Sequence, residues 1–103
     1  MPTYNKLVRD LIPQIIDKKN KSLTTRILND SEYILELKNK LGEEVEEYLS
    51  ASNDQDAIEE LADIMELLHA LAEVHGASPQ DLEKVRAHKA EQRGGFKDRI
   101  YLI

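Results

Sequence analysis

The sequence contains two short acidic motifs with helical spacing, separated by a short gap. Glu43, Glu44 and Glu47 form a Glu-Glu-x-x-Glu pattern, and Glu60 and Asp63 form a Glu-x-x-Asp pattern. Residues three positions apart project from neighbouring positions on one helix face, so the members of each pair point roughly together. A tight turn between two such helices would bring the pairs face to face. Converging carboxylates repel one another unless a cation lies among them, and Mg²⁺ prefers oxygen ligands of this kind.

Acidic runs on helices are more often solvated faces than binding sites. The helical phase of these two motifs argues against a solvated face. Both Glu44 and Glu60 share their helix face with large apolar side chains. At about 100° per residue, three apolar residues fall within about 60° of Glu44: Leu37, Leu41 and Tyr48. Three more fall within about 40° of Glu60: Ile64, Leu67 and Leu71. Carboxylates that point into a bundle are costly unless they are paired or bind metal, so the phase favours a site.

The bulk properties of the chain exclude several classes of function. With 103 residues, we expect one small domain spanning residues 1–103. A net charge of −6 argues against a nucleic-acid polymer as partner, although not against a single nucleotide. The absence of cysteine excludes disulfides, zinc thiolates and a thiol nucleophile. No apolar run approaches the length of a membrane span and no signal peptide is evident, so we expect a cytoplasmic protein without membrane contact.

The pattern along the chain predicts an all-α fold, an antiparallel helical bundle built on a central two-helix hairpin. The hairpin comprises residues 30–50 and 54–75, with helices over 10–20 and 79–92 packed around it. Expected N-caps are Asp10 for the first helix, Asp30 or Ser31 for the second, Asn53 or Asp54 for the third, and Ser78 with Pro79 for the fourth. Segments 22–29 and 98–103 are β-prone and form at most a minor β element. The core is thin, with one Phe and no Trp, so we expect a homodimer or a higher homo-oligomer.

Three stretches together resemble a known group of enzymes. The paired acidic motif is similar to that of the all-α nucleotide pyrophosphohydrolase superfamily, which contains MazG and phosphoribosyl-ATP pyrophosphatase. The segment from Tyr4 to Pro13, YNKLVRDLIP, resembles the opening of a small single-domain branch labelled phosphoribosyl-ATP pyrophosphohydrolase-like or house-cleaning. Arg93-Gly94-Gly95-Phe96 before the β-like tail resembles the ending of that branch.

The resemblance implies Mg²⁺-dependent hydrolysis, with Mn²⁺ as a substitute cation. The bond cleaved would join the α- and β-phosphates of a nucleotide, and the products would be a monophosphate and pyrophosphate. The expected substrate is a modified or surplus nucleoside triphosphate; phosphoribosyl-ATP is the alternative that the branch label suggests. A non-catalytic acidic helical module, which binds a metal or another protein, is the alternative from a different class. The presence of all four carboxylates of the paired motif favours the enzyme.

Roles for individual residues follow from the spacing and from the resemblance. Glu44, Glu47, Glu60 and Asp63 are the expected metal ligands. Glu43, about 100° from Glu44 on the helix, either orients the water molecule in catalysis or a ligand, or is only solvated. Lys40 lies one turn before Glu44 and either binds phosphate or forms an i,i+4 ion pair. The resemblance adds further basic residues that either bind substrate or are ordinary surface charges: Lys6, Arg9, Lys89 and Arg93. We assign no role to the histidines and expect His69 to be exposed.

Overall fold

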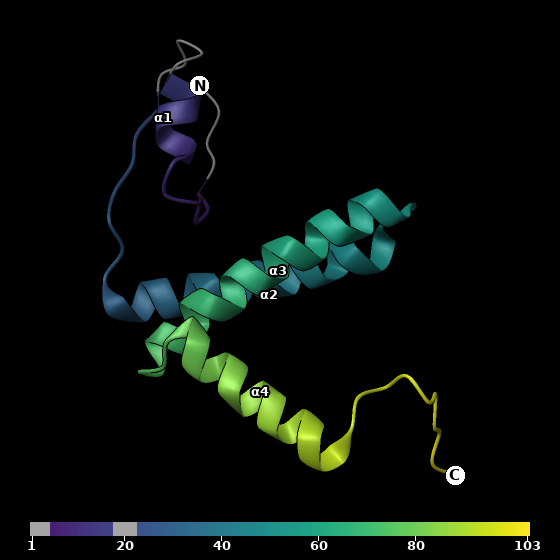
Figure 1. Ribbon diagram of the computed structural model, residues 1–103. Coiled ribbons are helices and arrows are strands. Elements are labelled where there is room, and N and C mark those ends of the chain that lie inside the picture. The colour runs from purple at the N-terminus through teal and green to yellow at the C-terminus, as the bar shows by residue number, and fades with distance from the viewer. Residues whose placement is uncertain (1–4, 18–22) are drawn as a thin grey trace. The chain divides into compact units, whose positions relative to one another are not determined.

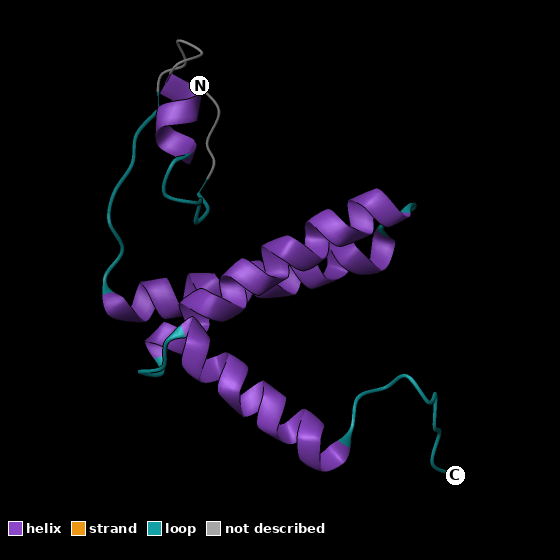
Figure 2. Ribbon diagram, viewed as in Figure 1, coloured by secondary structure: helices purple, strands orange, loops and turns teal. Residues whose placement is uncertain are grey.

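The computed structural model describes residues 5–17 and 23–103, and every regular element in them is a helix. The elements are α1 (Ile12–Asp17), α2 (Asp30–Ser50), α3 (Asp54–Val74) and α4 (Pro79–Arg93) (Figure 1). None of the described residues forms a β-strand, as Figure 2 shows. The all-α class predicted from the sequence is confirmed.

The helices α2 and α3 form the antiparallel hairpin that the sequence predicts at the centre of the fold. Residues 51–53 connect them, and the two helices lie alongside each other (Figure 1). Among the described residues, the buried apolar side chains are Leu37 of α2 and Leu67 of α3. They lie on the helix faces that also carry Glu44 and Glu60. The packing that forms the hairpin therefore also brings these two carboxylates together.

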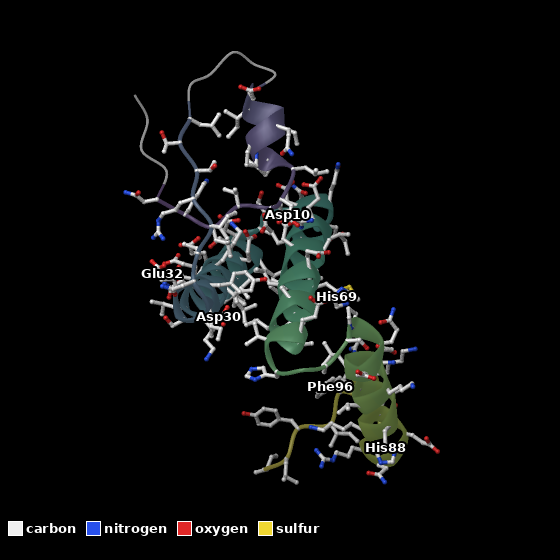
Figure 3. The ribbon with its side chains drawn as sticks, turned by 90° about the vertical axis from the view of Figure 1, so that its left-hand side faces the viewer. Asp10, Asp30, Glu32, His69, His88 and Phe96 are labelled. Carbon is white, nitrogen blue, oxygen red and sulfur yellow. The ribbon has the colours of Figure 1, made fainter. Side chains whose placement is uncertain are left out.

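A capping box centred on Asn29 starts α2, although the sequence analysis expected Asp30 or Ser31 as the N-cap. The Asn29 side chain accepts a hydrogen bond from the backbone N–H of Glu32 at 2.9 Å, and the Glu32 carboxylate accepts one from the Asn29 N–H at 3.4 Å. Asp30 lies in the first turn, close to Glu32 (Figure 3). The expected N-cap was wrong by one residue, because this reciprocal pair satisfies two backbone donors that a cap at Asp30 would leave open.

Local hydrogen bonds also fix the starts of α3 and α4 where the sequence predicts them. The Asn53 side chain accepts a hydrogen bond from the backbone N–H of Asp56 at 2.8 Å. The Ser78 hydroxyl accepts one from the Asp81 N–H at 3.0 Å, and the Asp81 carboxylate accepts one from the Ser78 N–H at 3.0 Å. These bonds to Ser78 lower the pKa of Asp81. Pro79 then occupies the first turn, where its missing N–H costs nothing.

Glycines with a left-handed backbone follow α3 and α4. Gly76 has a φ of 80° and Gly94 a φ of 81°, a conformation in which a Cβ would be strained. The hairpin helix α3 ends one residue earlier than predicted and α4 one residue later.

No residue of α4 is buried. On its surface, the guanidinium of Arg86 donates two hydrogen bonds to the Glu83 carboxylate, at 2.6 and 2.8 Å.

The first helix is shorter than the predicted span of residues 10–20, of which 18–20 lie outside the described residues. The backbone N–H of Ile12 donates to the Arg9 carbonyl at 3.0 Å, closing a tight turn before the helix. Asp10 lies in this turn (Figure 3), so its assignment as an N-cap was wrong. Pro13 lies in the first turn of α1 as predicted, because proline is tolerated there.

The two β-prone segments have no regular structure where the structure describes them, which is residues 23–29 and 98–103. Ser22, at the start of the first segment, lies outside the described residues. In the tail, Ile100 and Leu102 are exposed. A strand requires a partner that supplies cross-strand contacts, and β propensity alone does not provide one. The minor β element allowed for in the sequence analysis is therefore absent from these residues.

The chain divides into two compact units, residues 1–67 and 68–103, with the boundary inside α3. The first unit contains α1, α2 and most of α3, and therefore both acidic motifs. The second contains the end of α3 and all of α4.

Candidate metal centre

Three carboxylates gather at one point of the hairpin. Glu44 and Glu47 of α2 and Glu60 of α3 each offer one oxygen atom, and these atoms lie within 4.8 Å of one another. The Glu44 side chain is 12% exposed, whereas Glu47 is an exposed residue, as expected for positions inside and at the edge of the apolar stripe. The helical spacing of the motifs and the antiparallel turn account for this convergence.

The electrostatics of the cluster favour a bound cation. One carboxylate oxygen of Glu44 and one of Glu60, both Oε2, are buried without a hydrogen-bond partner. The pKa of Glu60 is raised to about 7, first by the neighbouring carboxyl of Glu44, then by the loss of solvent and by the carboxyl of Glu47. Buried oxygen atoms without partners are costly, and a hard divalent cation takes carboxylate oxygens as ligands. The residues present therefore fit a divalent metal.

The fourth predicted ligand, Asp63, is held differently. It lies one turn after Glu60 on α3, but its carboxylate accepts a hydrogen bond from the guanidinium of Arg9 at 2.5 Å. The two side chains are partly open to solvent, with 53% of Arg9 and 41% of Asp63 exposed. The structure thus gathers three of the four predicted ligands and pairs the fourth with a basic residue 54 positions away in the chain.

A cavity of about 420 Å³ lies next to the acidic cluster along α2. Lys40 connects the two, because it lines the cavity and its Nζ lies 3.9 Å from a carboxylate oxygen of Glu44. Two other predicted site residues, Lys6 and Glu43, line the same cavity. The i,i+4 ion pair predicted for Lys40 is therefore present. Because Lys40 also lines the cavity, its binding of phosphate stays a prediction.

Other residues of this cavity are absent from the sequence-based site. They are Asn5, Leu7, Glu36 and Asn39. Glu36 and Asn39 precede Lys40 and Glu43 by one turn, so the helical spacing that identified the acidic motif could also have found them. The position of Asn5 and Leu7 depends on how the N-terminal segment packs against α2, which no local pattern encodes.

The remaining candidates lie in the second unit. Lys89 and Arg93 are exposed residues of α4, so their assignment to substrate stays a prediction. His69 of α3 and His88 of α4 can be located in Figure 3. His69 was expected to be exposed, and this was wrong: residues 69–72 are all half-buried, so the last turns of α3 are covered on more than its apolar stripe.

The hairpin carries paired acidic motifs that offer oxygen ligands to a divalent cation. This arrangement is typical of the MazG-like superfamily of all-α nucleoside triphosphate pyrophosphohydrolases. The family model for phosphoribosyl-ATP pyrophosphohydrolase matches residues 5–90. The chain belongs to this family, and membership implies hydrolysis of a pyrophosphate bond. No curated protein and no solved structure gave a match. Within the described residues, no helix combines the length and hydropathy that crossing a bilayer requires.

Proposed function

We propose that this chain is a Mg²⁺-dependent pyrophosphohydrolase that cleaves the α–β phosphate bond of a modified or surplus nucleoside triphosphate. Water is consumed, and the products are the nucleoside monophosphate and pyrophosphate. The observation that carries the proposal is the convergence of Glu44, Glu47 and Glu60 with two orphaned, buried oxygen atoms among them. The family match adds support for the type of bond, and its description names phosphoribosyl-ATP as the alternative substrate.

Glu44, Glu47, Glu60 and Asp63 are the residues we assign to the cation. When bound, the cation supplies Lewis-acid chemistry at the phosphate oxygens and lowers the pKa of a nearby water. Mn²⁺ has the same ligand preferences and can replace Mg²⁺. The hairpin contributes a fixed arrangement of ligands, because the carboxylates extend from two packed helices and not from a loop.

The chain's other polar residues bind and orient the substrate in this proposal. Lys40 and Lys6 line the cavity beside the acidic cluster, where ammonium groups attract the phosphates. Glu43 lines the same cavity. It is therefore our candidate general base, which would orient the attacking water and accept its proton. Arg9, Lys89 and Arg93 are the further basic residues assigned to substrate.

We further propose that residues 1–103 act as one domain and assemble as a homodimer or a higher homo-oligomer. Large apolar side chains on the hairpin support this, since Leu49 of α2 is 75% exposed and Ile58 of α3 is 64% exposed. A second copy that covers them would gain roughly 25 cal/mol for each Å² of apolar surface removed from water. Because the proposed substrates are nucleotides, we place the enzyme in the cytoplasm.

The test is pyrophosphate release by the purified chain with Mg²⁺ or Mn²⁺, across standard and modified nucleoside triphosphates and phosphoribosyl-ATP. Glu44→Gln removes a charged ligand of the cluster with little change in shape. Glu59→Gln on α3 is the matched control, because Glu59 is an exposed acid outside the gathered carboxylates. We expect release to fall by at least about a hundredfold in Glu44→Gln, the scale of losing one charge-stabilising group, and to persist in Glu59→Gln.

Two results would contradict the proposal. Orthophosphate as the direct product would mean that another bond is cleaved. A chain that binds Mn²⁺ but turns over none of these nucleotides would instead be a non-catalytic metal-binding or protein-interaction module.

A further inference from the structure

The contact between Arg9 and Asp63 joins two residues that the proposed function would use for different ligands. Asp63 belongs to the acidic motif but its carboxylate is engaged by a guanidinium. Arg9 belongs to the N-terminal segment whose neighbouring residues, Asn5, Lys6 and Leu7, line the cavity beside the acidic cluster. A guanidinium at this position has two natural anionic partners, a carboxylate and a phosphate, and it binds both with the same planar donor geometry.

The other three carboxylates of the paired motif gather without Asp63. Glu44, Glu47 and Glu60 bring oxygen atoms within 4.8 Å of one another, and Asp63 is not part of this group. Asp63 nevertheless follows Glu60 by three residues on α3, which places both on neighbouring positions of one face. Releasing Asp63 from Arg9 would free a fourth carboxylate beside the cluster.

We propose that Arg9 exchanges partners during binding. Without nucleotide, it holds Asp63 and keeps that carboxylate away from the cation. When a polyphosphate enters, Arg9 transfers to a phosphate oxygen and Asp63 becomes available to the cation. Metal and nucleotide then each strengthen the binding of the other, because a coupling between two sites is reciprocal. Arg9 is a positioning residue in this scheme, and the inference rests on the proposed metal centre.

The size of the effect follows from the exposure of the pair. An ion pair that is about half open to solvent is worth little, and breaking it changes an equilibrium by about two- to fivefold. We therefore expect Arg9→Met to raise the affinity for Mn²⁺ by about two- to fivefold in the absence of nucleotide. Residues that hydrogen-bond to a metal ligand often orient it for the metal. If Arg9 oriented Asp63 in this way, Arg9→Met would instead lower the affinity for Mn²⁺.

Loss of a positive charge near a cation site raises affinity by simple electrostatics, so the test is a double-mutant cycle. Mn²⁺ binding is measured by calorimetry for the wild type, Arg9→Met, Asp63→Asn and the combined variant. Partner exchange predicts that Arg9→Met gains more affinity where Asp63 is present than in the Asp63→Asn background. A gain of equal size in the Asp63→Asn background would overturn the inference, and so would a loss of affinity in Arg9→Met.

A matched control is available within the first unit. Arg26 pairs with Glu32 at 2.8 Å, with 66% and 39% of the two side chains exposed, so Arg26→Met removes a comparable ion pair and the same charge. It should leave Mn²⁺ affinity unchanged. Thermal melting checks that all variants fold.

The nucleotide arm uses a triphosphate analogue with a methylene group in place of the α–β bridging oxygen, which cannot be cleaved there. In the wild type the analogue should raise Mn²⁺ affinity, and in Arg9→Met it should raise it by a smaller factor. An equal increase in both proteins would overturn the exchange. These outcomes differ from failure of the proposed function, which would show as no Mn²⁺ binding by the wild type or no pyrophosphate release.

Discussion

Gly42 lies inside α2, next to the acidic motif, and replacing it tests whether the space around this helix is used. Glycine within a helix is less favourable than alanine by about 0.5–1 kcal/mol, because it loses more backbone freedom on folding. A Cβ added at Gly42 would meet no atom within 4 Å, and the backbone there is helical. The full gain should therefore be realised in Gly42→Ala.

The gain can be expressed as a melting temperature. A domain of this size shifts by about 4–8 °C for each kcal/mol, so Gly42→Ala should melt about 2–8 °C higher than the wild type. Circular dichroism at 222 nm follows the helix signal. All proteins are compared at one chain concentration, since assembly makes the melting temperature depend on it.

Gly94→Ala is the matched control for Gly42→Ala. Gly94 has equally open space around it, but its φ of 81° strains any residue with a Cβ, so this variant should melt lower than the wild type. A lower melting temperature for Gly42→Ala would refute the reasoning. It would mean that a second copy of the chain approaches α2 closely at this glycine. If Gly42→Ala melts higher as expected but releases pyrophosphate more slowly than the wild type, a nucleotide comes close to the helix there.

Further predictions concern the metal centre and a helix cap. The pKa of Glu60 is raised from its ordinary value of 4.5 to about 7. The protonated Glu60 carboxyl therefore stabilises the metal-free protein fully below pH 4.5, and this stability is lost as the pH rises through about 7. Urea unfolding in a chelator should thus show stability falling over this pH range in the wild type, and Glu60→Gln should flatten the fall; a wild-type curve that rises there would contradict it. Mg²⁺ at about 100 times its dissociation constant should stabilise the wild type by about 2.7 kcal/mol. Glu44→Gln should lose most of that increment in a thermal melt, and retention of it would remove Glu44 from the ligand set. Asn29→Ala should cost about 0.5–2 kcal/mol in urea unfolding, because the capping box is lost, and a smaller cost would show that water replaces it.

The sequence was sufficient where the structure depends on neighbours along the chain. Ser78 and Pro79 mark the start of α4 because both act within one helical turn. The gathering of Glu44 and Glu60 followed from helical phase, since a carboxylate within an apolar stripe must meet whatever that stripe packs against. The cap of α2 was missed by one residue because Asn29 is followed by other residues that also cap helices, and periodicity does not rank them.

The features that the sequence could not predict depend on distant parts of the chain. Arg9 and Asp63 are 54 positions apart, and no spacing rule connects them. The tail after Phe96 was expected to pair because of its β-branched and aromatic residues, yet a strand forms only where another strand is placed beside it. The cavity required the N-terminal segment to lie along α2, so its lining through Asn5 and Leu7 became evident only in three dimensions.

The lack of buried residues in α4 has a consequence for how this part of the chain opens. A helix of 15 residues without a buried residue depends mainly on its own hydrogen bonds, its capping box and the Glu83–Arg86 pair. Isolated helices of that length are marginal in water. The amide hydrogens of α4 should therefore exchange with solvent through local fraying, without unfolding of the hairpin, and far sooner than those around Leu37 and Leu67. In exchange experiments α4 would form a separate, weakly protected unit, whose protection rises only when another surface covers it.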